Sequence, residues 1–508
     1  MENFLRGPGA LTAERLRGIR RGIEKESLRA QSSGALAMSP HPHALGSALT
    51  HPHITTDFSE SQVELITGVH AQVQDCLDEL QDIQRAVFAG LGDELLWVSS
   101  MPCGLPADDA IPLGQYGVSN VGQSKTVYRR GLGHRYGRRM QTISGIHYNW
   151  SLPNVASEDY FGLIRNFRRH AFLLLYLFGA SPAVCSPFVA GRQHQLQALN
   201  PHTMYLPHAT SLRMGRLGYQ SDAQASLAVS YNSLEGYAHS LHGALTRPYP
   251  AYEAIGVKGA HGEYLQLGTS LLQIENEFYG TIRPKRVIFP GERPLHALRE
   301  RGVEYVEVRL MDLDPFEPVG IQAQTMRFLD VFLLHCLQTQ SPPDSPAEIV
   351  ALSHNQQSVA ERGREPGLTL ERGDMRVSLK EWGLDLVQQM HPLAAALDAA
   401  HGGRDYQQAV LAAVEGLEQP DTLPSARVLQ TLQRDFDGSF VAFVRAQSEQ
   451  LRRNTLAADF PADKVLQFAA LAETSWQDQA RIEAADTMPF DIYLKAYLDP
   501  QRLVARAA

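Results

Sequence analysis

The chain has 508 residues, of which 44% are hydrophobic and 20% are charged, a composition typical of a globular protein. This length predicts about two to four domains, although single catalytic units of this size also occur. The formal net charge of −9, with no long basic stripe to offset it, argues against a nucleic-acid-binding protein. The longest apolar run, residues 171–180, is too short to span a bilayer, and the N-terminus lacks the apolar region of a secretory signal. We therefore expect neither a nucleic-acid partner nor a membrane partner.

The cysteines lie far apart in the sequence and show no metal-ligand spacing. Proteins of a reducing compartment keep such thiols free, and free cysteines are usually buried. We therefore expect four buried free thiols in a cytoplasmic protein. The residues concerned are Cys76, Cys103, Cys185 and Cys336.

Residues 22–29 are predicted to form a strand, because Ile23 and Leu28 fit no helical stripe. In a strand, side chains at positions i and i+2 leave the same face about 6.6 Å apart, so Glu24 and Glu26 are close neighbours. Two such carboxylates repel each other, and glutamate is poorly suited to strands. Either this face is solvated, or a cation that prefers hard oxygen ligands, most naturally Mg²⁺, relieves the repulsion.

Residues 31–53 are rich in serine, glycine, proline and histidine, which fits a turn-rich loop better than a metal-binding histidine cluster. A second strand is predicted at residues 62–67, where the acidic Glu64 stands among apolar neighbours, with Asp57 in the turn before it. Residues 71–90 have apolar residues at helical spacing and end at a glycine, so they are predicted to form a helix that faces the core.

Residues 117–125 resemble a phosphate-binding loop, but two residues separate Gly122 from Lys125. In a phosphate loop the lysine must directly follow the last glycine, and a buried strand must lead in, so we reject this interpretation. The basic residues between 129 and 139 could bind an anion or simply lie on an exposed segment.

Residues 141–151 are predicted to form a strand with apolar residues on one face and polar residues on the other. The polar face carries Gln141, His147 and Asn149. A single strand histidine is usually structural, but here polar groups share its face. A helix is predicted at residues 159–178. By spacing alone, Arg213 is an ordinary arginine.

Two further strands are predicted, at residues 272–279 and 303–309. The first would place two glutamates and Tyr279 on one face, and the second Glu307 and Arg309. Several strands with charged residues at period two indicate a sheet with one face that forms a charged cavity. Carboxylates for Mg²⁺ and arginines for phosphate or carboxylate groups favour phosphoryl-transfer chemistry.

These stretches together resemble the glutamate–cysteine ligases of the proteobacterial type. The resemblance runs from about residue 18 to 370 and continues more loosely to the C-terminus. The motifs that carry it include EKESLR (24–29), ALTH (48–51), ITTDF (54–58), QYG (115–117), MQTISGIHYN (140–149), YLFGASP (176–182), ATSLR (209–213), QIENE (273–277), RPKR (283–286), EYVEVR (304–309) and EAADTMPF (483–490).

The resemblance implies an α+β fold like that of the glutamine synthetase catalytic domain, in which a curved, mainly antiparallel sheet forms a funnel surrounded by helices. We expect a catalytic core at residues 1–370 and a helical region at 371–508 that packs on the core without being an independent domain. Within this region, apolar spacing predicts helices at residues 382–400, 406–418, 425–454 and 464–485.

The implied reaction joins the γ-carboxyl of L-glutamate to the amine of L-cysteine through γ-glutamyl phosphate, with ATP as co-substrate, in the first step of glutathione biosynthesis. The family is monomeric and uses two or three Mg²⁺ ions, for which Mn²⁺ can substitute. The positions that match metal ligands of the family are Glu24, Glu26, Asp57, Glu64, His147 and Glu307.

Other positions match residues of the family that contact substrates. Arg213 matches the arginine that binds the α-carboxylate of glutamate, and Arg309 and Arg129 match arginines near the transferred phosphoryl group, where Glu307 also acts. The polar residues Gln141 and Asn149 share the strand face of His147. The expected wall of the cysteine pocket comprises Phe58, Tyr128, Tyr219 and Tyr279.

Two other classes of function stay open at this point. A related enzyme on the same fold could use another amine acceptor or act as a phosphagen-type kinase, with the same metal face and a different pocket. A non-catalytic relative would have lost metal ligands, and all six are present here.

Overall fold

The computed structural model describes residues 9–218, 222–225, 227 and 229–504. Its largest sheet has the strand order β2-β3-β1-β5-β10-β9, and β4 pairs with β1. Every pairing in this sheet is antiparallel, as expected. The strands are β1 Arg20–Ala30, β2 Ile54–Thr56, β3 Gln62–Ile66, β4 Leu95–Leu96, β5 Ile146–Ser151, β9 Ile282–Lys285 and β10 Tyr305–Met311.

One face of this sheet packs on α5 (Ser157–Phe178), which contacts β9 and β10, and on α2 (Val73–Gly90), which contacts β1 and β3, and α11 (Ala323–Gln338) packs on both helices. The strand alternation of β5 places Tyr148 and Trp150 on this face, where both are buried, as predicted. The Tyr148 hydroxyl donates a hydrogen bond to Asp330 of α11 (2.8 Å), and Arg21 of β1 forms an ion pair with the same carboxylate (2.9 Å). The opposite face carries the charged residues.

Of the predicted strands, the one at residues 141–151 is wrong in its first part and the one at residues 272–279 does not form. Gln141 ends the short helix α4 (Arg138–Gln141), and β5 begins only at Ile146. The helical turn forms because the Asp108 carboxylate accepts hydrogen bonds from the backbone N–H groups of Arg138 and Arg139 (3.0 and 2.8 Å).

Residues 272–279 form no strand, and their centre is the 3₁₀ turn η4 (Glu275–Glu277). The Glu277 carboxylate accepts a hydrogen bond from the backbone N–H of Gln273 (2.7 Å), which closes a turn. Glu275 and Glu277 are both buried, and each forms an ion pair with an arginine. These two carboxylates therefore lie outside the charged face of the sheet.

The prediction of four free thiols is also wrong. Cys103 and Cys185 form a disulfide with a Cα–Cα distance of 5.4 Å, whereas Cys76 and Cys336 are free and buried. The bonded cysteines are 82 residues apart, so only the packing of the loop after β4 against β6 (Ala183–Cys185) brings them together. Sequence spacing contains no signal for a pairing over that distance.

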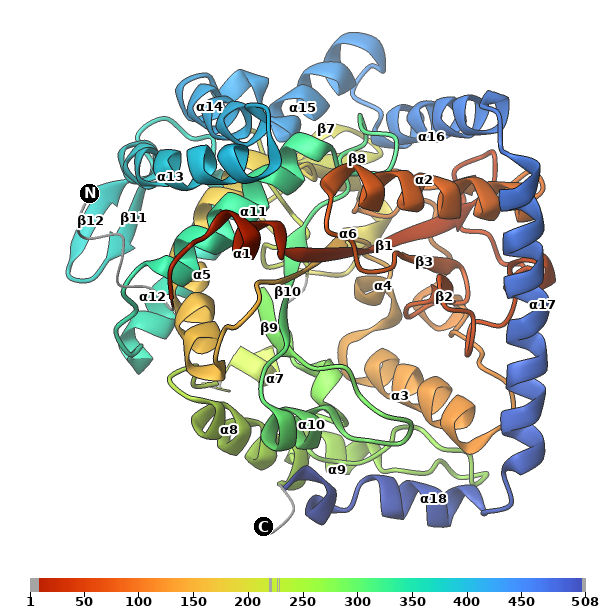
Figure 1. Cartoon of the computed structure of the whole chain (residues 1–508). Coiled ribbons are helices and arrows are strands. Elements are labelled where there is room, and N and C mark those ends of the chain that lie inside the picture. Colours follow the sequence, from red (N-terminus) through yellow and green to blue (C-terminus); the bar gives the residue numbers. More distant parts are fainter. Residues whose placement is uncertain (1–8, 219–221, 226, 228, 505–508) are drawn as a thin grey trace.

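The C-terminal residues are helical, and the helices surround the core (Figure 1). The predicted helix at residues 425–454 is two helices, because Asp437 and Gly438 both have positive φ angles (48° and 73°), which ends α15. Helix α14 contacts α11, α16 contacts α2, and α18 contacts α3. The helices are α13 Leu379–His401, α14 Asp405–Glu418, α15 Pro424–Asp435, α16 Phe440–Ala457, α17 Ala462–Ala485 and α18 Phe490–Tyr497.

The long helix α17 runs along one edge of the molecule from α16 to α18 (Figure 1). It packs on the histidine-containing loop, where His43 stacks on Trp476 (4.7 Å between ring centroids) and Ser47 N donates a hydrogen bond to Ser475 Oγ (2.9 Å). In the described part of the chain, no group of three potential metal ligands includes a histidine of this loop. The loop therefore serves as a docking surface for α17.

Helix α2 (Val73–Gly90) confirms the helix predicted at residues 71–90. None of the helices in the described part of the chain combines the length and apolar character that a bilayer span requires.

The other α-helices and strands are α1 Ala13–Arg17, α3 Asn120–Tyr136, α6 Ser186–Val189, α7 Asp222–Ala225, α8 Leu234–Thr246, α9 Pro250–Ile255, α10 Pro294–Arg301, α12 Pro346–Arg362, β7 Gln197–Asn200, β8 Thr203–Tyr205, β11 Thr369–Arg372 and β12 Met375–Ser378.

Candidate active site

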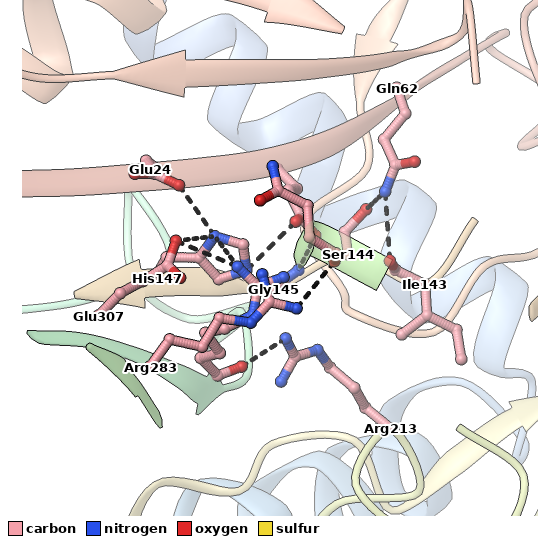
Figure 2. Close-up of polar contacts among 12 residues, drawn as sticks. Glu24, Gln62, Ile143, Ser144, Gly145, His147, Arg213, Arg283 and Glu307 are labelled. Carbon is pink, nitrogen blue, oxygen red and sulfur yellow. Dashed lines mark hydrogen bonds and ion pairs between the residues drawn. The ribbon is translucent and has the colours of Figure 1, made fainter. Parts of the chain in front are cut away.

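The charged face of the sheet centres on His147 of β5. Its Nδ1 lies 3.0 Å from Glu24 Oε2 and 3.8 Å from Glu307 Oε1, and its Nε2 lies 3.5 Å from Glu26 Oε1. Figure 2 shows Glu24 and Glu307 converging on His147 from the two neighbouring strands. Three strands that are far apart in sequence thus supply one cluster.

Sheet register explains how these residues meet. Glu24 of β1 pairs with His147, and Glu26 pairs with Glu64 of β3, so the acidic residues form cross-strand neighbours on one face. Two groups of potential ligand atoms result, each with all its atoms within 4.8 Å of one another. One comprises Glu24, His147 and Glu307, and the other Glu26, Glu64 and His147.

The negative charges of the carboxylates in this cluster are not fully compensated by neighbouring positive charges. Burial and the charge of Asp57 raise the pKa of Glu26 to about 8. Burial and the charge of Glu24 raise the pKa of Glu64 well above its ordinary value. Protonation relieves the excess negative charge in the absence of a cation, and a bound cation would relieve it by displacing those protons.

Glu307 is in a different environment. Burial opposes its charged form, but Lys285 (Nζ–Oε1 3.4 Å) and Arg309 (Nη1–Oε1 3.1 Å) outweigh burial and lower its pKa well below the ordinary value. The buried Oε2 atom of Glu307 and Nε2 of His147 have no hydrogen-bond partner among the described residues. An ionised carboxylate oxygen and an imidazole nitrogen that lack partners fit a divalent metal ion.

Two other expected residues lie beside the two ligand groups. Asn149 donates a hydrogen bond to Glu24 Oε1 (3.0 Å), so it orients a potential metal ligand. Asp57 belongs to neither ligand group, although its charge contributes to the raised pKa values of Glu26 and Glu64. It therefore lies close to the cluster but in a separate position on the turn between β2 and β3.

Arg213 is 1% exposed and approaches the same face from a loop (Figure 2). It donates a hydrogen bond to the backbone oxygen of Arg309 (2.8 Å), and its Nη1 lies 4.0 Å from Asp312. A Cβ atom at Gly145 would lie 2.1 Å from Arg213 Nη2, so only glycine permits this approach. Arg213, Arg309 and Tyr279 line one cavity of about 260 Å³.

Arg129 lies on helix α3 and reaches the turn that contains Asp57. Its Nε donates a hydrogen bond to the backbone oxygen of Asp57, and its guanidinium stacks on Tyr116, 4.4 Å from the ring centroid. The expected anion-binding arginine is therefore next to the metal-ligand cluster, and the segment around it is a helix instead of an exposed loop.

The expected acceptor pocket is only partly assembled from the described residues. Gln141 donates a hydrogen bond to the hydroxyl of Tyr279 (2.7 Å), which lines the cavity. Tyr128 is half-buried against Val127, Leu267 and Leu494, and Phe58 is 1% exposed, so both also have a packing role. Tyr219 lies outside the described residues.

The comparisons with known proteins decide the family. A sequence profile of the glutamate–cysteine ligase family matches residues 10–359. The chain is 48% identical to the glutamate–cysteine ligase of Alcanivorax borkumensis over 96% of both chains, and 48% identical to that of a Janthinobacterium species over 95% of both chains. The chain belongs to the glutamate–cysteine ligase family.

Solved structures agree with this membership. A glutamate–cysteine ligase from Francisella tularensis, in complex with AMP, superposes with a TM-score of 0.91 at 35% identity and covers 96% of this chain and 98% of that one. A bifunctional glutathione synthetase from Pasteurella multocida superposes with a TM-score of 0.71 at 25% identity, with 57% of that chain covered. The α+β fold of helices and antiparallel sheet is therefore that of a ligase family.

Sequence reasoning missed several residues that contact this ligase site. Lys285 contacts Glu307. Lys285 and Arg283 are two residues apart on β9, and this spacing predicts that their side chains lie on the same face of the strand. Asp312 accepts hydrogen bonds from Ser181 (2.6 Å) and Ser211 (3.0 Å) and lies behind Arg213. No sequence signal exists for Asp312, because three separate segments build that network.

Proposed function

We infer that the protein catalyses the ATP-dependent joining of L-glutamate and L-cysteine to γ-glutamylcysteine, the first step of glutathione biosynthesis. The observation that carries the inference is the buried arginine Arg213 beside an acidic cluster centred on His147, in a chain of this family. An arginine suits a carboxylate substrate, and an acidic cluster suits the metal that accompanies ATP.

Glutamate would bind with its α-carboxylate on Arg213. The cavity that contains Arg213 and Arg309 has room for a small amino acid, and Arg213 is already oriented by the backbone of Arg309. With the α-carboxylate held at Arg213, the γ-carboxylate would extend toward Arg309 and the acidic cluster. Such positioning supplies a large part of the barrier reduction in phosphoryl transfer.

The acidic cluster would hold two or three Mg²⁺ ions, with Mn²⁺ as a possible substitute. Held there, Mg²⁺ would supply positive charge that neutralises the phosphates of ATP. The residues that would hold it are Glu24, Glu26, Asp57, Glu64, His147 and Glu307.

The reaction would then proceed in two steps. First, a γ-carboxylate oxygen of glutamate attacks the γ-phosphorus of ATP in line, and ADP leaves, while Arg309 and Arg129 stabilise the negative charge on the transferred group. Second, the cysteine nitrogen attacks the carbonyl carbon of γ-glutamyl phosphate, the carbon–oxygen bond to phosphate breaks, and the nitrogen loses a proton. The hydrogen bond between Gln141 and Tyr279 would shape the acceptor side of the cavity.

Cysteine would be selected by aromatic side chains, including Tyr279, Tyr128, Phe58 and Tyr219. An apolar pocket separates analogues that differ by one small group by only about 1–3 kcal/mol. We therefore expect 2-aminobutyrate, which has a methyl group in place of the thiol, to be a slower acceptor. Amino acids with bulky or charged side chains should not react.

We further propose a cytoplasmic monomer, because ATP and free amino acids are supplied in the cytoplasm and the family resemblance implies a monomer. Residues 371–508 are proposed to fold only with the core, since their helices contact α2, α3 and α11. Light scattering after gel filtration tests the first proposal, and a dimer peak at micromolar concentration would contradict it.

The proposed function is tested by ADP release together with chromatographic detection of γ-glutamylcysteine. We expect ADP release to require glutamate, cysteine and Mg²⁺ together. Equal turnover with ammonia in place of cysteine would point to a ligase with a different acceptor. ADP release without any amine would favour a kinase.

A further inference from the structure

Lys125 belongs to the segment that sequence analysis rejected as a phosphate loop. It lies inside helix α3, one turn before Arg129, and its backbone oxygen accepts a hydrogen bond from Arg129 Nη1 (3.0 Å). Its Nζ lies over the ring of Tyr116, 5.0 Å from the centroid, and the guanidinium of Arg129 lies 4.4 Å from the same centroid. One aromatic ring thus contacts two cations.

Two adjacent positive charges repel each other, and a nearby anion would relieve this repulsion. Within the described ranges, no carboxylate forms an ion pair with Lys125 or Arg129, and the side-chain hydrogen bonds of Arg129 go to backbone oxygens. Burial and the nearby charge of Arg129 lower the pKa of Lys125 to about 8, against the opposing charge of Glu64. Cation–π contact with Tyr116 offsets only part of this cost, because such contacts contribute about 0.5–2 kcal/mol.

The position of this cation pair is fixed relative to the acidic cluster. The Tyr116 hydroxyl donates a hydrogen bond to the backbone oxygen of Thr56 (2.7 Å) and lies 3.1 Å from that of Asp57. Arg129 contacts the same turn, and Glu64 is close enough to act on the charge of Lys125. The two cations therefore lie beside the proposed metal-ligand cluster, where the phosphates of a nucleotide would meet positive charge on both sides.

The start of helix α3 is closed to a phosphate group. The backbone N–H groups of Val118 and Asn120 donate hydrogen bonds to the carboxylates of Glu483 and Asp486, and that of Gly122 donates to Ser119 Oγ (3.2 Å). A phosphate would be repelled by these carboxylates. An anion near α3 can therefore be bound only through the side chains that project from the middle of the helix.

We propose that Lys125 binds the polyphosphate of ATP together with Arg129 and is thus a further substrate-binding residue of this site. A polyphosphate matches two adjacent cations better than the single carboxylate of an amino acid does. The proposal rests on the proposed function in that ATP is the substrate. Lys125 would thus contact phosphate as the lysine of a phosphate loop does, although its segment is a helix and not such a loop.

The test compares the variants Lys125→Met and Lys125→Arg with the wild type and with Lys495→Met, an exposed lysine on α18. Methionine keeps the apolar stem and removes the charge, so the packing against Tyr116 is retained. A hydrogen bond to a charged group contributes about 1.5–3 kcal/mol, so Lys125→Met should raise the ATP KM about 10- to 100-fold. The KM values for glutamate and cysteine should change less than about threefold, and Lys125→Arg should recover part of the loss.

A second measurement does not depend on ligation. Calorimetric titration with Mg²⁺-ATP and with adenosine should show weaker binding of ATP to Lys125→Met and unchanged binding of adenosine, which has no phosphates. If the wild type binds ATP but forms no γ-glutamylcysteine, the proposed function fails and the titration still tests Lys125.

Three results would overturn the proposal. An unchanged ATP KM together with unchanged ATP binding would show that the lysine contacts no phosphate. A selective rise in the cysteine KM would assign Lys125 to the carboxylate of the acceptor. An equal loss for all substrates with a lower melting temperature would show a structural role.

Discussion

Two groups of buried glutamates in this protein have opposite environments. Glu275 and Glu277 each form a short ion pair, with Arg293 (2.7 Å) and with Arg135 (2.8 Å). Among the residues described, Glu24, Glu26 and Glu64 form no ion pair with an arginine or a lysine, and Glu24 and Glu26 lie against His147. Both groups come from stretches that alternate glutamate with other residues, so the sequences look alike.

The difference separates structural carboxylates from functional ones. A carboxylate with a built-in counter-ion contributes to the fold, and removing one partner leaves an uncompensated buried charge. A set of carboxylates without counter-ions reduces stability until a cation binds, which is a property of metal sites and active sites. Charge balance in the folded state therefore indicates function where residue type does not. Substitutions of single carboxylates and of their partners test this distinction.

The largest effect is expected for Glu277→Gln. This change leaves Arg135 buried without its carboxylate, which should cost about 3–5 kcal/mol of unfolding free energy. Urea denaturation measures the loss, with Glu253→Gln on the exposed surface of α9 as a control. If Glu277→Gln unfolds at the wild-type urea midpoint, Glu277 is not a structural carboxylate of the kind described.

Glu307 differs from both groups, because it has basic partners, Lys285 and Arg309, whose side chains remain partly exposed (29% and 19%). Glu307→Gln should therefore mainly reduce turnover. Loss of one ionised ligand should weaken Mg²⁺ binding and lower kcat by about 10²-fold, which corresponds to about 2.7 kcal/mol. Steady-state assays over a range of Mg²⁺ concentrations, together with the melting temperature, give the measurement. Wild-type turnover at saturating Mg²⁺ would remove Glu307 from the metal site.

Arg213→Lys sharpens the comparison on the cationic side. Lysine keeps the charge but loses the planar, two-pronged geometry that suits a carboxylate. We expect the glutamate KM to rise about tenfold, with ATP and cysteine nearly unaffected. Equal changes for all three substrates would mean that Arg213 supports the fold and not the substrate.

The pH dependence of stability gives a smaller effect with a defined sign. The pKa of Glu26 rises to about 8 in the folded protein. Protonation of Glu26 therefore stabilises the fold, and this contribution is complete below about pH 4.3, the pKa of a glutamate in the unfolded chain. This contribution is lost as the pH rises through about 8. At the proposed site, Mg²⁺ would have to displace protons from Glu26 and Glu64, so its affinity should rise about tenfold per pH unit for each proton released.

Thermal melting therefore should show a larger Mg²⁺-induced shift near pH 8.5 than near pH 6.5. Glu26→Gln should reduce the pH dependence of this shift. Glu275→Gln, which changes a glutamate that has an arginine partner, should leave that pH dependence unchanged. A shift that is the same at both pH values in the wild type would contradict a proton-holding metal site.

The smallest effect is expected at the contact between α17 and α3. Asp486→Asn removes the charge that accepts hydrogen bonds from Asn120 at the start of α3, and such a helix cap contributes about 0.5–2 kcal/mol. We expect that loss in urea denaturation, with Asp478→Asn on the surface of α17 as a control. An unchanged stability would weaken the proposal that residues 371–508 fold only with the core.

Strands with regular alternation could be predicted from the amino-acid sequence alone. Glu24 and Glu26 on β1, and Glu307 with Arg309 on β10, lie where a period of two predicts them. The family followed from motifs along the chain, and the profile and the relatives confirm it. Alternation and motifs are local properties, so they can be read without knowing which segments meet.

Which charges find partners depends on how the chain packs in three dimensions. Glu277 meets Arg135 across 142 residues, and Cys103 meets Cys185 across 82. Each of these contacts depends on how distant segments pack, and the free energy of a charge depends on its burial and neighbours more than on its residue type. For that reason the same glutamate pattern became an ion pair with arginine at Glu277 and a cluster around His147 without such an ion pair at Glu26 and Glu64.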